Sequence, residues 1–195
     1  LESVLGQTRR PDRVIAMDDG SKDGSLEVLH SFEGRGVEVH AQENQGAHAA
    51  INRLVEFAAA DCEWVGILNS DDRYLPRRLD LALEVARQHP GQAVVATGLR
   101  VIDADGAVLP DDAPRSRWFH GAWKLGEHDG IGMAEWLGQA TFVATSSNIL
   151  ARASYLRANP FRPYRFNHDY FFLVTAMLEN QLQVCPEVLL EYSVH

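Results

Sequence analysis

The chain has 195 residues, of which 46% are hydrophobic, and its formal net charge is −9 at pH 7. This length suits one large domain, and the hydrophobic content is sufficient for a substantial core. The negative charge argues against a nucleic-acid partner, because phosphate backbones bind basic surfaces. No apolar run reaches the roughly 20 residues that cross a bilayer, and no signal-peptide pattern opens the sequence.

Strand and helix patterns alternate along the first hundred residues, which predicts a mostly parallel sheet covered by helices. The chain opens on what resembles the last turns of a helix ended by Gly6, and it closes on a strand-like run, so we expect a piece of a longer sequence. The expected strands are Arg13–Met17, Gly36–His40, Trp64–Leu68, Ala93–Thr97 and Val188–Val194, and the expected helices are Ser25–Phe32, Ala47–Ala60, Pro76–Gln88, Ala151–Asn159 and His168–Asn180.

The pattern weakens after residue 100. A hairpin is expected to turn at Asp105-Gly106. From Pro110 to Gly132 no periodicity is visible, and a stretch of this length favours a functional loop or lid. A short helix at Ala134–Leu137 and a strand near Thr141–Ala144 are expected beyond it.

The two cysteines, Cys62 and Cys185, lie far apart in the sequence and have no metal-binding spacing. We expect both to be reduced, buried thiols. This favours a cytoplasmic location, at most peripheral to the inner face of a membrane.

Two acidic clusters directly follow apolar strands. Asp18 and Asp19 end the first expected strand, and Asn69, Asp71 and Asp72 follow the third. Adjacent carboxylates repel each other and lose hydration on burial, so they require a cation or hydrogen-bond donors. Ligands of open α/β sheets bind beyond the carboxyl ends of the strands. We therefore expect both clusters to meet at one edge, with Mg²⁺ or Mn²⁺ and a diphosphate bound there.

Each acidic motif also has a purely structural interpretation. The segment Asp18–Gly24 fits a turn that caps a helix, and it does not fit an EF-hand, because the twelfth position from Asp19 is His30 rather than Glu. Asp72 or its neighbour suits a cap of the following helix. Asp169, at the head of an apolar helix, fits a helix cap and a general base equally well.

Other polar and aromatic residues carry weaker signals. Trp118, Trp123 and Trp136 would suit stacking on a sugar ring, and they suit hydrophobic anchors equally. Ser146-Ser147-Asn148 would suit contacts with substrate hydroxyls, although such residues are also common in turns.

The order of these short motifs resembles family 2 glycosyltransferases of the GT-A fold. The block Asp169-x-Phe171-Phe172 is similar to the acceptor-side segment of the bacterial spore-coat polysaccharide enzyme of this family. The motifs that carry the resemblance are Ser3-Val4-Leu5-x-Gln7-Thr8, Asp18-Asp19-Gly20-Ser21-x-Asp23-Gly24-Ser25, Asn44-Gln45-Gly46, Leu68-Asn69-Ser70-Asp71-Asp72 and Pro76. The resemblance implies a three-layer α/β/α sandwich around a mostly parallel sheet. Residues 1–104 would form the nucleotide-sugar-binding half and residues 105–195 the acceptor-side half.

The resemblance also implies an activity. It is the metal-dependent, inverting transfer of a sugar from a nucleoside-diphosphate donor, commonly UDP-linked, to a saccharide, lipid or peptide acceptor. Asp19 would bond the nucleobase, Mn²⁺ or Mg²⁺ would stabilise the diphosphate, and Asp169 would deprotonate the acceptor hydroxyl. The positions implied are Asp18, Asp19, Asn44, Gly46, Asn69 and Asp71 for the nucleotide sugar, Asp71 and Asp72 for the metal, and Asp169 for the base.

The sequence departs from the family pattern at three points. Asn69 stands where many members have Asp, and Ile51 stands where many have Arg. The family's first strand, which lies centrally in its sheet, is absent, so we expect a gap in the sheet. A catalytically inactive nucleotide-sugar-binding or scaffolding domain of the same fold is therefore an alternative. A nucleotidyltransferase is a third interpretation, but its Gly-rich phosphate loop is not visible.

Overall fold

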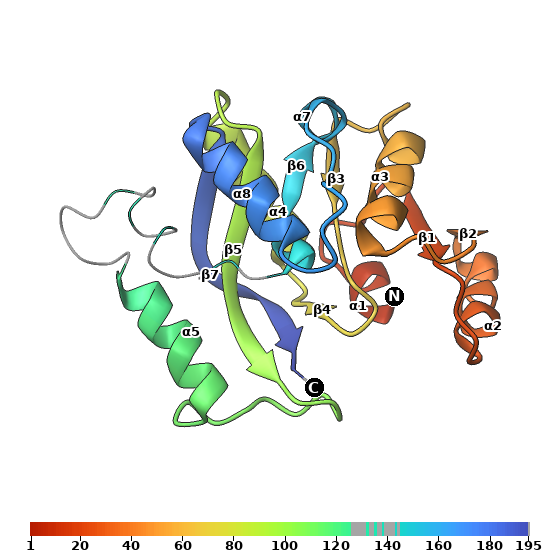
Figure 1. Cartoon of the computed structure of the whole chain (residues 1–195), viewed down its shortest axis with the longest axis horizontal. Helices are drawn as coiled ribbons and strands as arrows, with labels where there is room; N and C mark the ends of the chain where they lie inside the picture. The colour runs from red at the N-terminus through yellow and green to blue at the C-terminus, as the bar shows by residue number, and fades with distance from the viewer. Residues whose placement is uncertain (126–131, 133–134, 136–137, 139–142, 144, 195) are drawn as a thin grey trace.

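The computed structural model describes residues 1–125, 132, 135, 138, 143 and 145–194. They form an α/β fold with two sheets and flanking helices (Figure 1). In chain order the elements are α1 (Glu2–Leu5), β1 (Val14–Asp18), α2 (Ser25–His30), η1 (Glu33–Arg35), β2 (Val37–Ala41), α3 (Ala47–Ala58), β3 (Trp64–Gly66), β4 (Arg73–Tyr74), α4 (Arg78–Gln88), β5 (Val94–Ile102), α5 (Pro114–Leu125), η2 (Ser146–Asn148), β6 (Leu150–Arg152), α7 (Ala153–Ala158), α8 (His168–Leu178) and β7 (Leu182–Ser193).

The larger sheet has the order β3-β6-β5-β7-β4. Its long central strands β5 and β7 are parallel, whereas β3–β6, β5–β6 and β4–β7 are antiparallel. The sheet is therefore mixed rather than mostly parallel. The difference arises because β4 and β6 lie antiparallel beside longer strands, and both are too short to show a periodic pattern in the sequence.

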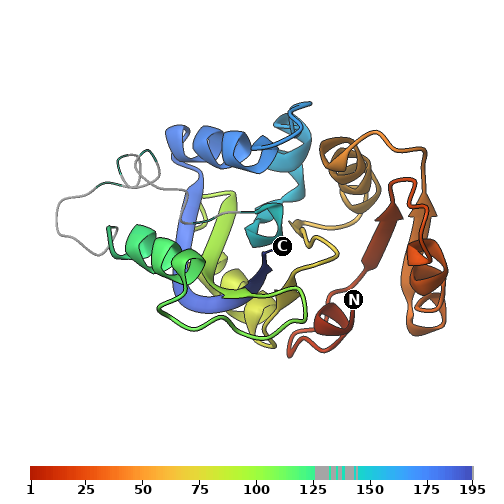
Figure 2. The same ribbon diagram turned by 60° about the horizontal axis from the view of Figure 1, so that its bottom comes forward.

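Helices cover both faces of the larger sheet, with α8 on one side and α4 on the other (Figures 1 and 2). On β5, Val94 and Ala96 pack into the core that contains Leu173 of α8, whereas Val95 packs with Ala82 of α4. This alternation follows from the period of two residues in a strand whose faces are both buried. The expected α/β fold class is confirmed.

The smaller sheet consists of β1 and β2 alone, paired in parallel with Val14 opposite Val37. Helix α3 connects it to the rest of the molecule, since Ile51 and Val55 lie in the main core. The Asn52 side chain also exchanges two hydrogen bonds with the Phe161 backbone, at 2.9 and 2.8 Å. Among the described strands none pairs with both β1 and β3, so the expected gap is present.

Some elements differ from the expectation. Helix α5 occupies most of the stretch expected to be a loop, because Phe119, Ala122 and Trp123 lie at helical spacing that the surrounding Arg, His and Gly obscure. The hairpin is short, with one bridge between Ile102 and Val108. The expected helix at 134–137 and strand at 141–144 lie, apart from residues 135 and 143, outside the described residues.

The cysteines are free thiols, with Cys185 buried and Cys62 half-buried. Within the described parts of the chain, no helix combines the length and the apolar character that crossing a membrane requires.

Candidate functional site

The first acidic cluster is organised around Asp19, directly after β1. Its Oδ1 accepts hydrogen bonds from Gln42 Nε2 at 2.8 Å and from the Gln45 backbone N–H at 2.9 Å. Its Oδ2 accepts one from the Gly46 backbone N–H at 2.8 Å. An ionised carboxylate offers about four lone-pair sites. Counting the donors among the described residues, one site on Oδ2 remains for an N–H donor of a ligand.

The charge of Asp19 is stabilised by these donors. Burial opposes ionisation of Asp19, but the hydrogen bonds from Gln42, Gln45 and Gly46 outweigh it and, with His48 nearby, hold its pKa below the ordinary value. Asp19 is thus an acceptor-only group that stays ionised to low pH. Such a group selects ligand N–H or O–H donors.

Two loops approach each other closely here, and Gly20 permits it. A Cβ at Gly20 would lie 2.8 Å from the Asn44 backbone nitrogen, and Gly20 has φ +77°. The neighbouring Asp18 is buried, and its Oδ2 accepts the N–H groups of Gly20 and Ser21, both at 3.1 Å. Asp18 therefore shapes the turn that presents Asp19, and Asn44 lies beside this turn. Direct contacts of Asp18, Asn44 and Gly46 with a donor stay a prediction.

The second acidic cluster follows β3 and is held by the segment before β6. The backbone N–H of Asn69 donates to Ser147 Oγ at 2.8 Å, and its Nδ2 donates to Thr145 Oγ1 at 2.9 Å. Ser146 Oγ donates to Asn69 Oδ1 at 2.9 Å. Thr145 has φ 58° and ψ 138°, a conformation that β-branched residues rarely adopt. Asn69 thus fixes the loop instead of facing solvent.

The two aspartates of this cluster have different environments. Asp72 is only 4% exposed; its Oδ2 accepts from Thr145 Oγ1 at 3.1 Å, and its Oδ1 accepts from the Ser193 N–H at 2.9 Å. Burial raises the pKa of Asp72, although hydrogen bonds from Ser147, Ser193 and Thr145 oppose the rise. Asp71, by contrast, is exposed. Asp71 is therefore the better placed of the two to meet a ligand.

A buried polar network supports this loop from below. Asn148, with no exposed surface, accepts from the Thr97 N–H at 2.9 Å and donates to the carbonyls of Thr97 and Val143 at 2.8 and 3.1 Å. The Arg78 guanidinium donates to Thr97 Oγ1, to Asn148 Oδ1 and to the Ser147 carbonyl, and lies 4.5 Å from the ring centroid of Tyr74. A buried cation thus lies under the acidic loop.

Tyr192 of β7 precedes Ser193, whose backbone N–H binds Asp72, and its phenol responds to the acidic groups of the site. Burial raises the pKa of the Tyr192 phenol; the charges of Asp72, Asp169 and Asp71 raise it further, while Arg115 lowers it. Asp169 lies in the first turn of α8, where its Oδ1 accepts the Tyr170 N–H at 2.8 Å. Asp72 is thus hydrogen-bonded to β7 beside Tyr192, and Asp169 lies at the start of α8.

A metal ion at this site would depend on Asp71, Asp72 and on groups of the bound substrate. Among the described residues no group of three His, Cys, Asp or Glu side chains forms a closed metal cage. Mg²⁺ is commonly held by one or two carboxylates, several waters and substrate phosphates. Asp71 is exposed and suits such a ligand, whereas Asp72 is only 4% exposed. Metal binding by Asp71 and Asp72 stays a prediction.

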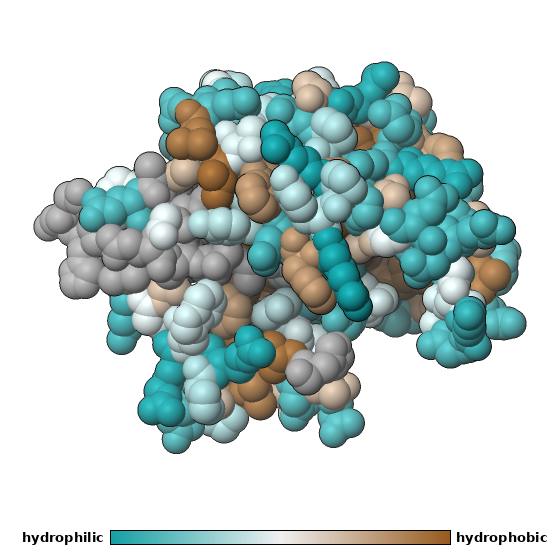
Figure 3. Space-filling model, viewed as in Figure 1, coloured by the Kyte–Doolittle hydropathy of each residue, from teal (hydrophilic) through white to brown (hydrophobic). Residues whose placement is uncertain are grey.

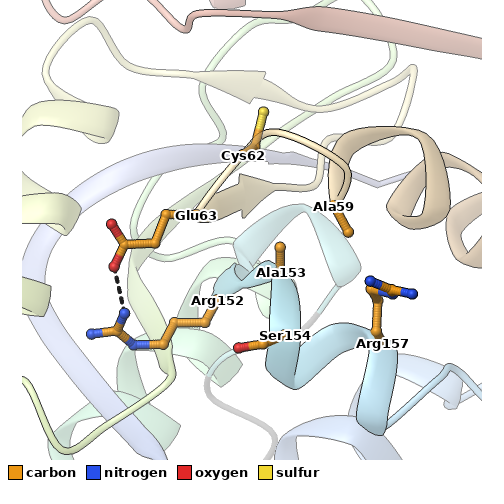
Figure 4. A pocket seen from close by; sticks show the side chains of 7 residues that line it. All are labelled: Ala59, Cys62, Glu63, Arg152, Ala153, Ser154 and Arg157. Carbon is orange, nitrogen blue, oxygen red and sulfur yellow. Dashed lines mark hydrogen bonds and ion pairs between the residues drawn. The ribbon is translucent and has the colours of Figure 1, made fainter.

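A surface hollow of about 220 Å³ lies elsewhere, between the end of α3 and the start of α7 (Figure 4). The Glu63–Arg152 ion pair crosses its rim, and Cys62 and Arg157 line it. None of the predicted site residues contributes to this hollow.

Several supporting residues were not predicted. Gln42 directly follows β2, and Asp19 directly follows β1, which pairs in parallel with β2. This equivalent position was the sequence signal that could have identified Gln42. Tyr192 and Thr145 carry no sequence signal of their role. Ser146, Ser147 and Asn148 are buried in the network, so they support the loop.

The three tryptophans also have different places. Trp118 on α5 is half-exposed and packs edge-on against Phe119. Trp123 packs against the core, and Trp136 lies outside the described residues. A sugar-stacking role for Trp118 stays a prediction.

The chain is similar to known proteins in both sequence and structure. The chain is 31% identical over 129 residues to a Bacillus subtilis protein assigned provisionally to teichuronic acid biosynthesis, the glycosyltransferase TuaG, with 64% of this chain and 50% of that protein covered. It is 32% identical over 111 residues to the chondroitin synthase of Pasteurella multocida, with 56% of this chain and 11% of that protein covered. The chain thus spans half or less of the length of these relatives.

The crystal structure of S. aureus TarS 1–349 in complex with UDP superposes with a TM-score of 0.70 over 99% of this chain and 55% of that one, at 18% identity. At this identity the likeness shows the fold, which agrees with the expected GT-A architecture. The family model for glycosyl transferase family 2 matches residues 1–157, which include both acidic clusters and the buried network. Because this match covers most of the chain, the chain belongs to glycosyl transferase family 2.

Proposed function

We propose that this chain is the donor-binding and catalytic part of a metal-dependent, inverting glycosyltransferase that moves a sugar from a UDP-linked donor to an acceptor hydroxyl. The observation that carries the proposal is the pair of carboxylate groups after β1 and β3: Asp19, oriented by three protein donors, and exposed Asp71 beside buried, hydrogen-bonded Asp72. Membership in family 2 supports it, as does the UDP in the similar TarS structure. The proposal includes Mn²⁺ or Mg²⁺, a saccharide, lipid or peptide acceptor, and a cytoplasmic location.

Asp19 would recognise the nucleobase. The remaining lone-pair site on its Oδ2 suits the imide N–H of uracil, a single donor. Because three protein donors already orient the carboxylate, little ordering is required on binding. The charged acceptor also discriminates against a base that presents an acceptor atom at this position.

Asp71 would meet the diphosphate end through the metal, and Asp72 would keep that loop in place. The ion, when bound, supplies Lewis-acid stabilisation of the leaving diphosphate. Asp169 would take the proton from the acceptor hydroxyl. The hydroxyl oxygen would then attack the anomeric carbon while the bond between that carbon and the diphosphate breaks. Among the described residues, the Tyr170 N–H binds one Asp169 oxygen, and we assign the other to this proton.

Titration calorimetry with UDP, with and without Mn²⁺, tests the donor site. We expect Mn²⁺-dependent binding by the unmodified chain and a loss of at least tenfold in affinity for Asp71→Ala. Asp12→Ala, which removes an exposed carboxylate from the loop before β1, is the matched control and should bind UDP as the unmodified chain does. Binding that requires neither Mn²⁺ nor Asp71 would contradict the proposed donor site.

Turnover of UDP-sugars tests the base. We expect Asp169→Asn to bind UDP normally and to lose roughly 10²–10⁴-fold in turnover. Normal UDP binding together with no turnover by the unmodified chain, over a panel of UDP-sugars and acceptors, would favour the inactive binding domain instead.

A further inference from the structure

A cationic, aromatic surface surrounds the start of α8, next to the proposed base. From Trp136 to His168 the sequence contains four arginines and no Asp or Glu, in a chain whose formal net charge is −9. Two of the arginines are paired, Arg152 with Glu63 and Arg157 with Glu56. Within the described residues, Arg162 and Arg165 form no ion pair, and both are exposed.

Three aromatic side chains accompany these arginines. Phe166 is 70% exposed, and the Arg165 guanidinium lies 5.3 Å from its ring centroid. Tyr164 and Phe171, 39% and 44% exposed, lie with their ring centroids 4.6 Å apart and their planes inclined by 32°. Exposed rings of this size lose hydration when a ligand covers them, so their clustering marks an interaction surface.

The position of this surface relates it to the reaction. Apart from Phe171, which lies on α8, its residues lie in the segment between α7 and α8, which faces the viewer in Figure 1. Figure 3, in the same orientation, shows brown and teal residues side by side over this segment. The segment leads directly into the turn of α8 that carries Asp169. An acceptor whose hydroxyl reaches Asp169 therefore lies beside this surface.

We propose that Arg162, Tyr164, Arg165, Phe166 and Phe171 bind an anionic acceptor, a chain of sugar or polyol units that carries carboxylate or phosphodiester groups. The proposal rests on the proposed function, because it assigns the substrate class of that same site. Unpaired guanidiniums bind carboxylate and phosphate groups in bidentate geometry. The aromatic rings pack against the apolar faces of the sugar or polyol units.

Charge explains why such a surface is needed. A protein of net charge −9 repels a polyanion over distances of about one Debye length, roughly 8–10 Å at ordinary ionic strength. Arg162 and Arg165 supply positive charge where the anionic acceptor would dock. Binding should therefore be specific to this surface and sensitive to salt.

Fluorescence polarisation with labelled oligomers tests the proposal. The probes are a galacturonic acid hexamer, a glycerol-phosphate oligomer, and maltohexaose as the neutral counterpart. We expect both anionic probes to bind more tightly than maltohexaose. The double variant Arg162→Gln/Arg165→Gln should bind them roughly tenfold more weakly, as the loss of two exposed charge pairs allows. Phe166→Ala should weaken binding of the anionic probes as well.

The control removes the same charge elsewhere. Arg9→Gln/Arg10→Gln, two exposed arginines before β1, should bind the anionic probes within twofold of the unmodified chain. Equal binding of maltohexaose, or an equal loss in the Arg9/Arg10 variant, would overturn the proposal. Arginine-dependent binding to phosphatidylglycerol vesicles without binding to the oligomers would also overturn it, in favour of membrane docking.

UDP titration with Mn²⁺ separates this proposal from the proposed function. The Arg162/Arg165 variant should bind UDP as the unmodified chain does. If UDP binds and the anionic oligomers do not, the acceptor assignment alone fails. If the oligomers bind and UDP does not, the proposed donor site is wrong. The surface is then not an acceptor site, and this proposal is overturned as well.

Discussion

The two acidic clusters of this molecule hold their carboxylates in opposite ways. Asp19 is half-buried, and its donors come from a single short loop, Gln42–Gly46. Asp72 is buried, and its donors come from Thr145 and Ser193, far along the chain. Accordingly, the pKa of Asp19 lies below its ordinary value and that of Asp72 above it.

The two environments suit different roles: that of Asp19 suits contact with a ligand, and that of Asp72 suits support of its loop. Asp19 keeps its charge and one lone-pair site near the surface, as a group that contacts a ligand requires. Asp72 is buried, and its hydrogen bonds to Thr145 and Ser193 hold the loop that exposes Asp71. Of the neighbouring pair Asp71 and Asp72, one is exposed and the other buried, so experiments on stability and on binding should separate them.

The largest effect is expected in the buried network. Asn148→Ala leaves the Thr97 N–H and the carbonyls of Thr97 and Val143 without their partner, so the free energy of unfolding should fall by about 3 kcal/mol or more. Urea denaturation measures this change. Asn159→Ala, which removes one bond to the Tyr155 carbonyl, should cost about 1 kcal/mol or less. Equal costs for both variants would show that the network does not support the acidic loop.

The next effect sharpens the distinction between Asp71 and Asp72. Asp72→Asn places an amide N–H₂ where an oxygen accepted a buried donor, so it should lower the free energy of unfolding by about 1–3 kcal/mol. Asp71→Asn, at an exposed position, should cost less than about 1 kcal/mol and should still weaken UDP binding in Mn²⁺. Urea titration measures the stability of both variants, and calorimetry measures their affinity for UDP. A larger loss of stability in Asp71→Asn than in Asp72→Asn would refute the distinction.

A smaller effect is expected at the loop that presents Asp19. Gly20→Ala places a Cβ 2.8 Å from the Asn44 nitrogen at φ +77°, so it should cost about 1–2 kcal/mol and weaken UDP binding. Gly34→Ala adds a Cβ with no atom within 4 Å and should change neither quantity appreciably. Unchanged UDP affinity in Gly20→Ala would detach this loop from the donor site.

The smallest effect is the pH dependence of Asp19. Because its folded-state pKa is lowered, its ionised form stabilises the fold above the unfolded-state pKa of about 3.9, and this contribution is lost as pH falls through the folded-state pKa. The destabilisation caused by Asp19→Asn should therefore be present at pH 7 and diminish in acid. Urea titrations at pH 7 and in acid measure this destabilisation, and Asp12→Asn, at an exposed position, is the control. A cost that grows in acid would contradict the assigned sign.

The sequence was sufficient for the elements that have a clear period. Strands ending at Asp18 and near Asn69, and the helix containing Asp169, were predicted from apolar spacing and lie where expected. Helix α5 was missed because its apolar residues are sparse, and β4 and β6 were missed because two or three residues show no period. The donors to Asp72 were not predictable, since Thr145 and Ser193 reach it only through tertiary packing.

The tie between the Asn69–Asp72 loop and residues 145–193 has a consequence for recombining relatives of this family. A crossover at residue 104, the expected boundary between halves, would part Asn69 from Thr145 and Asp72 from Ser193. The grafted segment would need a threonine that adopts the uncommon backbone conformation of position 145. It would also need a strand end whose backbone N–H replaces that of Ser193. Chimeras should therefore keep residues 145–148 and 191–194 from the parent that contributes the Asn69–Asp72 loop.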